Sequence, residues 1–203
     1  VDLDVRPFPL DTLASLEVEL AMRHPWVADL VIKLIGPGGS PVVTLMSRPS
    51  IDEPADDGTR MNGNDANLNP ASPVRFVDGA AVTAEDMGDG LGNRNVCAAD
   101  GVCVFAPAAG AATPGGLSSF VGGPASGAWR LCVADAAGAD VGAIDGAIAT
   151  ARTPRVLVAR ARVLVRSPCV DRSRVGCVRL VADQGATIDE APCLRLGWCV
   201  LLA

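Results

Sequence analysis

Residues 15–22 alternate apolar and polar side chains with a period of two, and this pattern limits the possible folds more than any other feature of the chain. Leu16, Val18 and Leu20 fall on one face, and the glutamates between them fall on the other. The segment is therefore predicted to be a strand with one buried face. The stretches between the 22 Gly and 15 Pro residues lack the 3.6-residue periodicity that helices need. An all-β fold is predicted.

Further strands are predicted where short apolar runs end at turn residues. A Gly-Pro-Gly-Gly turn at 36–39 is expected to join the first two of these runs in a hairpin. A count of about eight or nine strands with irregular connections favours a jelly-roll or Greek-key β-sandwich. Aromatic residues are scarce, so Val, Leu, Ile and Ala must form most of the core. The predicted runs are 29–35, 42–46, 74–77, 102–105, 129–134 and 143–149.

Charge is distributed unevenly along the chain. Residues 152–203 contain nine Arg and four acidic residues, a net charge of +5. Subtraction from the totals of 17 basic and 23 acidic residues leaves eight basic and nineteen acidic residues in 1–151, a net charge of −11. An acidic body of this kind repels nucleic acid and attracts cations or its own basic tail, although it also suits a merely solvated surface. Residues 48–73 form a long polar loop, which favours a functional or mobile segment.

The last quarter of the chain differs from the rest in composition. Residues 153–203 are rich in Arg and Cys, and three more strands are predicted near 156–165, 178–181 and 194–201. We expect two units, a sandwich over 1–152 and a C-terminal β extension packed on or beside it. A GC-rich gene translated out of frame yields a similar composition, which is the alternative origin for this segment.

Seven cysteines are many for a cytosolic chain and indicate an extracellular protein with disulfides. Cys132 lies on the strand face opposite Trp129 and is predicted to be the free, buried thiol. A zinc site is not expected, because no CxxC pair occurs and the chain has one His. Each of three predicted local bridges spans a short turn: Cys97–Cys103, Cys169–Cys177 and Cys193–Cys199.

Membrane and targeting signals are missing from the sequence. No run of 18 apolar residues occurs, so no membrane span is predicted. The sequence has neither a starting Met nor a signal peptide, so we expect it to be the mature part of a secreted protein.

Three segments of the chain carry motifs in a fixed order, at 24–40, 76–78 and 117–144. The first has a His, a short spacer, Asp-Leu, a strand and a Gly-Pro-Gly-Gly turn, and the second is Phe-Val-Asp. The third combines Leu-Ser-Ser-Phe-Val-Gly, Gly-Ala-Trp-Arg-Leu-Cys-Val-Ala-Asp and Asp-Val-Gly-Ala-Ile. In this order the segments resemble the P-domain of kexin- and furin-like proprotein convertases and bacterial secreted proteases, and the resemblance covers about residues 5–152.

The resemblance implies a β-sandwich that carries no catalytic centre and supports the catalytic domain of a subtilisin-like or metallo-protease. Trp129 is expected to close one end of the core. Gly127 and Gly142 suit turns with positive φ. One or both of Asp135 and Asp140 are expected to brace the turn between them through backbone amides. The residues that carry the family pattern are His24, Trp26, Phe76, Gly127, Trp129, Asp135, Asp140 and Gly142.

The resemblance also implies a structural calcium ion bound by Asp29 and Asp78. Calcium takes six to eight oxygen ligands, so Asn64, Asp65 and Glu85 from nearby loops are candidates to complete the set. A buried carboxylate beside an apolar strand needs either a cation or hydrogen-bond donors. The alternative for Asp29 is therefore a carboxylate that accepts backbone N–H bonds without an ion.

The motifs of the common hydrolases are absent. The single His24 limits nucleophilic catalysis, and no Gly-x-Ser-x-Gly, HExxH or P-loop pattern occurs. We therefore expect a non-enzyme whose partners are a protease catalytic domain and protein substrates. The alternative is an adhesive or carbohydrate-binding jelly roll, with loops 48–73 and 82–96 as its binding edge and Trp26 and Trp198 as possible sugar platforms.

Overall fold

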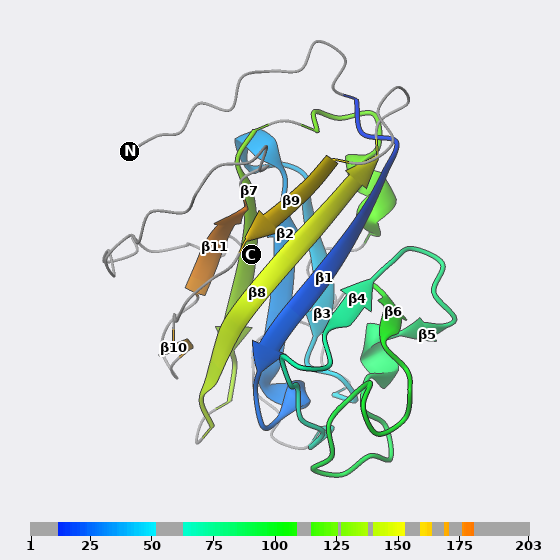
Figure 1. Cartoon of the computed structure of the whole chain (residues 1–203), viewed down its shortest axis with the longest axis vertical. Coiled ribbons are helices and arrows are strands. Elements are labelled where there is room, and N and C mark those ends of the chain that lie inside the picture. Colours follow the sequence, from blue (N-terminus) through cyan, green and yellow to red (C-terminus); the bar gives the residue numbers. More distant parts are fainter. Residues whose placement is uncertain are drawn as a thin grey trace.

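The described chain is mostly β-strand, arranged in two sheets with a few short 3₁₀ helices (Figure 1). The all-β prediction is confirmed. The computed structural model describes residues 12–51, 63–108, 115–125, 127–137 and 140–152, and the backbone of 159–163, 169–170 and 176–180. Side chains beyond Thr150, and those of Ile148 and Ala149, lie outside the description.

The larger sheet is built on the pairing of β1 with β8, which runs antiparallel from Ser15↔Arg152 to Arg23↔Ala143. On the other side of β1, β4 is also antiparallel, while β6 is parallel to both β4 and β5. The order is β10 (Cys169–Val170), β8 (Gly142–Arg152), β1 (Ser15–Arg23), β4 (Val74–Phe76), β6 (Val104–Ala106) and β5 (Val82–Thr83), with β9 (Ala159–Val163) also paired to β8.

The smaller sheet contains the predicted hairpin. β2 and β3 pair antiparallel across the Gly36–Gly39 turn, as expected, and β2 also pairs with β7. The order is β11 (Gly176–Leu180), β7 (Trp129–Asp135), β2 (Leu30–Ile35) and β3 (Val42–Ser47).

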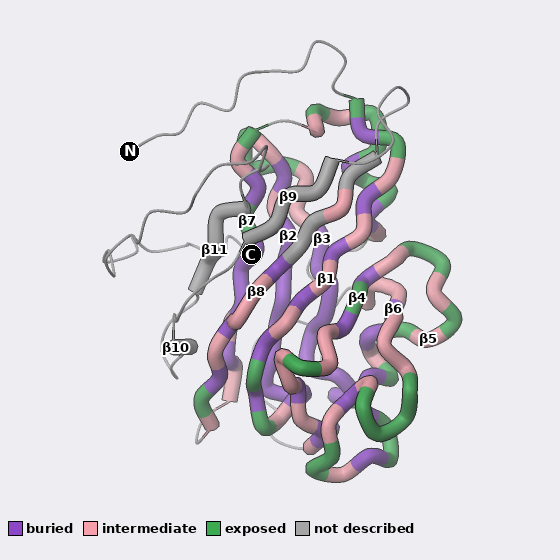
Figure 2. The backbone as a smooth tube through the Cα atoms, viewed as in Figure 1, coloured by how far each residue is buried: buried purple, intermediate pink, exposed green. Residues whose placement is uncertain are grey.

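One aliphatic core fills the space between the two sheets. The buried residues of β1 alternate with half-buried ones, so the predicted inward face of Leu16, Val18 and Leu20 is confirmed. On β7, Leu131 and Val133 face the same core. Figure 2 shows the buried segments as purple tube along the facing strands. Each fully buried Leu or Val side chain stabilises the fold by about 1.5–3 kcal/mol.

Four 3₁₀ helices occur among the described residues, at the ends of strands or in the connections. Leu117 and Phe120 of η4 are buried and belong to the core. The helices are η1 (Val27–Asp29), η2 (Pro37–Gly39), η3 (Ala84–Asp86) and η4 (Leu117–Phe120).

The described end of the long polar loop is tied to its neighbours by backbone hydrogen bonds. His24 and Leu68 exchange two such bonds, and the amide of Val27 donates to Ala66. The amide of Val96 donates to Asn67 from the other side. Residues 64–68 thus run between two segments like a short strand, while residues 52–62 of the loop lie outside the description.

The structure confirms one of the cysteine predictions and contradicts another. The Cys97–Cys103 bridge is confirmed. The free thiol at Cys132 is wrong, because Cys132 is disulfide-bonded. Its register partner on β11 is Cys177, a pairing across strands that turn spacing along the chain could not indicate. The predicted Cys169–Cys177 and Cys193–Cys199 bridges involve side chains that lie outside the described part of the chain.

Alkylation tests the state of Cys132. In the denatured but unreduced protein, we expect the peptide that contains Cys132 to resist iodoacetamide, because its sulfur is already bonded. Reduction should make the same peptide reactive, as read by mass spectrometry. Labelling of Cys132 before reduction would show a free thiol and contradict the structure.

Candidate functional site

Residues from the three P-domain-like segments gather at two ends of the sandwich. The histidine end lies where β1 and β7 finish, and it joins the first segment to the third. The tryptophan end lies near the start of β1, and it joins the second segment to the third. The histidine end comprises His24, Asp29, Asp135, Asp140 and Gly142, and the tryptophan end comprises Asp78, Leu117, Ser118, Phe120 and Trp129.

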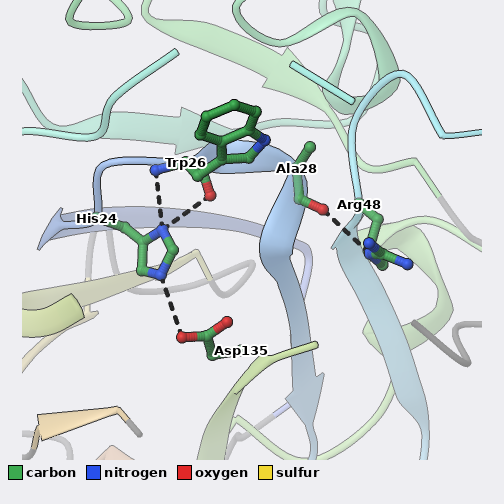
Figure 3. Close-up of polar contacts among 5 residues, drawn as sticks. All are labelled: His24, Trp26, Ala28, Arg48 and Asp135. Carbon is green, nitrogen blue, oxygen red and sulfur yellow. Dashed lines mark hydrogen bonds and ion pairs between the residues drawn. The ribbon is translucent and has the colours of Figure 1, made fainter. Parts of the chain in front are cut away.

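His24 is fully buried and links the two sheets (Figure 3). Its Nε2 lies 3.4 Å from Oδ2 of Asp135 at the end of β7. Its Nδ1 lies 2.8 Å from the carbonyl of Trp26 and 3.1 Å from the amide of the same residue. Because Trp26 presents both an acceptor and a donor, Nδ1 has a partner in either protonation state. The ring is therefore held in place whatever its charge.

Gly142 lets β8 approach this ring. A Cβ at Gly142 would lie 2.5 Å from Cδ2 of His24 and 2.7 Å from the Arg23 carbonyl, so no side chain fits. The positive φ predicted for Gly142 is wrong. Gly142 is the first residue of β8, and its φ is not positive. The prediction for Gly127 is confirmed, with a φ of 116°.

Asp29 and Asp135 are two buried carboxyls at the histidine end. Burial is the main cause that raises the pKa of Asp29, and the charge of Asp135 raises it further. Burial also raises the pKa of Asp135, against the opposing effect of His24. Oδ1 of Asp135 is buried without a hydrogen-bond partner in the described structure. Asp140 adds a third negative charge that raises the pKa of both.

Arg48 is the cation that faces this acidic group. It is fully buried, its Nε donates to the carbonyl of Ala28 at 3.1 Å, and its charge lowers the pKa of Asp29 (Figure 3). Arg48 has a φ of 43°, which is uncommon for a residue with a side chain. Sequence reasoning missed Arg48, because a charged residue between a strand and a polar loop is ordinarily solvated.

The turn that follows β7 acts on the Asp135 carboxyl. The backbone of Ala137 is one of the influences that lower the pKa of Asp135, against the larger effect of burial, which raises it. For Asp140 the structure supports an electrostatic effect on Asp29 and Asp135.

The tryptophan end is closed by aromatic packing. The rings of Trp129 and Phe120 lie 5.0 Å apart at an angle of 57°, and Nε1 of Trp129 donates to the carbonyl of Ala125 at 3.1 Å. Trp129 thus closes the core as expected, with its polar atom satisfied. Phe76, from the second segment, is fully buried in the same core.

Asp78 caps the N-terminus of η4. Its Oδ1 accepts the amide hydrogen of Leu117 at 2.8 Å, and its Oδ2 accepts that of Ser118 at 2.6 Å. These amides have no partner within the helix, so the carboxylate satisfies them. A Cβ at Gly116 would lie 2.6 Å from Oδ1 of Asp78, so the glycine makes room for the cap.

The structure does not bring Asp29 and Asp78 together. The β1–β4 register places Asp78 level with Leu16, because Val18 lies opposite Phe76. Asp29 lies near His24, eight residues further along β1. At about 3.3 Å per residue, the two carboxylates are roughly 25 Å apart. They do not fit a shared calcium ion, for which each would have to lie within about 2.6 Å of the metal.

The other candidate calcium ligands lie nearer the histidine end than Asp78 does. Asn64 accepts the amide of Ala28 with its backbone carbonyl, and its Nδ2 donates to Ser50 and Met87. A carboxylate oxygen of Glu85 accepts the amide of Ser50. Asp65 follows Asn64 and is half-buried. Among the described residues, no group of three His, Cys, Asp or Glu side chains is placed to hold a metal ion.

The chemistry available at the histidine end is that of a buried proton-binding group. Both ring nitrogens of His24 contact the backbone of Trp26 or the Asp135 carboxylate, and no Ser, Thr or Cys of the described chain is hydrogen-bonded to the ring. Nucleophilic catalysis needs such a contact. The geometry therefore favours a structural role for His24.

Comparison of the chain with protein-family models, with curated proteins and with solved structures finds no match. Within the described residues, every helix is too short or too polar to cross a membrane.

Replacement of Asp78 tests its capping role. Asp78→Ala should lower the free energy of unfolding by about 1 kcal/mol, because two amides at the start of η4 lose their acceptor. Asp86→Asn is the control, since exposed Asp86 contacts only Thr83 in the described structure. The loss should be equal in calcium and in EDTA, as measured by urea denaturation. A loss that appears only in calcium would make Asp78 an ion ligand.

The pH dependence of stability tests Asp29. A carboxyl with a raised pKa in the folded state binds more protons there than in the unfolded state. Stability therefore falls as pH rises from the ordinary value of 3.8 through the raised pKa, and the penalty is complete above it. Asp29→Asn removes this penalty, so it should raise the melting temperature at neutral pH, and the gain should shrink towards pH 4.

The control for this experiment is Asp89→Asn, because Asp89 is exposed and the substitution of an exposed residue should change stability little. The opposite result has two parts: a lower melting temperature for Asp29→Asn at neutral pH, and a rise in melting temperature on addition of calcium that the parent protein alone shows. Together they would show that a cation compensates Asp29.

Proposed function

We propose that the chain is a secreted, non-catalytic accessory module of the P-domain type, which stabilises the catalytic domain of a subtilisin-like or metallo-protease. One observation carries the proposal. Residues that carry the family pattern, although far apart in sequence, meet at two ends of the sandwich: His24 with Asp135 and Gly142, and Asp78 with η4. Each contact serves packing or capping, as a supporting module requires.

The strand pairing supports a jelly roll as the finer description of the fold. β1 pairs with β8 in one sheet, and β2 pairs with β7 in the other. Among the strands of residues 1–152, the first thus pairs with the last and the second with the second-last, in two different sheets, and a folded-over hairpin produces this arrangement in a jelly roll. β6 departs from the antiparallel pairing of a jelly roll, because it is parallel to both β4 and β5. These pairs lie at the end of the larger sheet that is remote from β8.

Cysteine chemistry supports an oxidising location. Cys97 and Cys103 form a disulfide, and Cys132 is also disulfide-bonded. Such bonds persist mainly outside the cytosol. The alternative function, sugar binding, has weaker support because Trp129 is buried in the core and Trp26 is half-buried. Trp198 lies outside the described residues.

Co-expression tests the proposed function. The catalytic domain of a secreted subtilisin-like or metallo-protease from the same genome is produced with and without this chain. We expect a longer half-life at elevated temperature and a higher folded yield when the chain is present, because the module buries part of the catalytic domain's surface. Purified chain alone should leave casein intact.

The control is a variant that folds less well, Gly142→Val, whose side chain would clash with His24. It should give a weaker effect on the protease. Cleavage of casein by the chain itself would make it an enzyme, and binding on a glycan array without any effect on the protease would favour the carbohydrate-binding alternative.

A further inference from the structure

The outer edge of β8 is occupied by the C-terminal extension. β9 pairs with the segment from Ala147 to Ala151, and β10 pairs with Gly142 and Ala143. In the other sheet, β11 pairs with the outer edge of β7. Figure 1 shows β9, β10 and β11 on the side of the molecule where β8 and β7 would otherwise end the sheets. The extension therefore covers an open edge in each sheet.

Apart from the irregularity at Asp145 in its ladder with β1, β8 lacks the features by which exposed edge strands avoid pairing with other chains. Edge strands are commonly protected by Lys, Pro, inward-pointing charges or short length. β8 is 11 residues long and contains no Pro or Lys. Between Asp145 and Arg152 its sequence is Gly-Ala-Ile-Ala-Thr-Ala, without a charge. An uncovered edge with this sequence is a template for strand addition.

Charge favours a covered β8. The extension, residues 153–203, carries eight Arg and four acidic residues, a net charge of +4, and residues 1–152 carry −10, so the two parts attract each other in addition to the backbone pairing. The uncharged run of β8 also presents no like charges to a second copy of itself. Two such strands can pair antiparallel about a twofold axis, in which both copies contribute the same surface.

We propose that the extension guards the outer edge of β8, and that this edge binds β8 of a second copy of the chain when β9 is displaced. The inference rests on the sheet topology and on the sequence of β8. It is independent of the proposed link to a protease, because it requires no partner other than the chain itself.

Paired proline variants of the full chain test this proposal. Adjacent residues of a strand direct their N–H groups to opposite sides, and β9 pairs with β8 on one side. Of Arg160→Pro and Ala161→Pro, one therefore removes a hydrogen bond to β8, while the other is tolerated as an edge-strand proline. Each variant is the matched control of the other.

The readouts are molar mass by light scattering over a range of concentrations and amide exchange of β8 at the lowest concentration. The parent chain and the tolerated variant should be monomeric, with slow exchange at those amides of Ala147–Ala151 that point towards β9 and not towards β1. The disruptive variant should show fast exchange there when dilute and form a dimer when concentrated. Adding Thr150→Lys to it should restore the monomer without restoring slow exchange, since a lysine protects an exposed edge.

Three results would overturn the proposal. Unchanged exchange in both proline variants would show that β9 does not cover β8. Fast exchange without a dimer would show that the uncovered edge does not bind a second copy. A dimer that survives Thr150→Lys would place the association elsewhere on the molecule.

Discussion

The aliphatic core between the two sheets is the constraint on which the rest of the structure depends. Its inner faces are lined mainly by Leu, Val, Ile and Met, and large aromatic side chains are few. Such a core packs well between strands but is open at the ends of the sandwich, where no strand covers it. One end is closed by Trp129 and Phe120, and the other by His24 against Asp135 and Gly142. Both closures are made by residues of the P-domain-like segments.

The two ends differ in electrostatic cost. At the tryptophan end, the Asp78 carboxylate accepts two backbone amide hydrogens, which stabilise its charge. At the histidine end, Asp29 and Asp135 are buried near each other and near Asp140, and their pKa values rise. His24 and Arg48 offset part of this repulsion. The histidine end thus holds two carboxyls with raised pKa values, so its contribution to stability falls as pH rises through them.

The extension completes the sandwich at its open edges. Its strands add to both sheets on the same side of the molecule, beside β8 and β7. Cys132 on β7 is disulfide-bonded, and the residue opposite it in the ladder with β11 is Cys177. The basic charge of the extension opposes the acidic charge of the body. The three described strands of the extension are thus paired into the two sheets of the sandwich.

The sequence by itself determined what is local. Alternation with period two, turn residues and short apolar runs were enough for β1, the β2–β3 hairpin, the inward face of β7 and the Cys97–Cys103 bridge, because these depend on neighbours in the chain. Tertiary structure alone decided which distant residues meet. Asp29 directly precedes β2 and Asp78 follows β4, so both lie next to strand ends. The antiparallel pairing of β1 and β4 nevertheless places them at opposite ends of the sandwich. The ring of His24 leaves no room for a side chain at Gly142. Cys132 is disulfide-bonded, and it lies opposite Cys177 in the ladder. Neither feature could be predicted, because contacts between strands depend on sheet register and not on spacing along the chain.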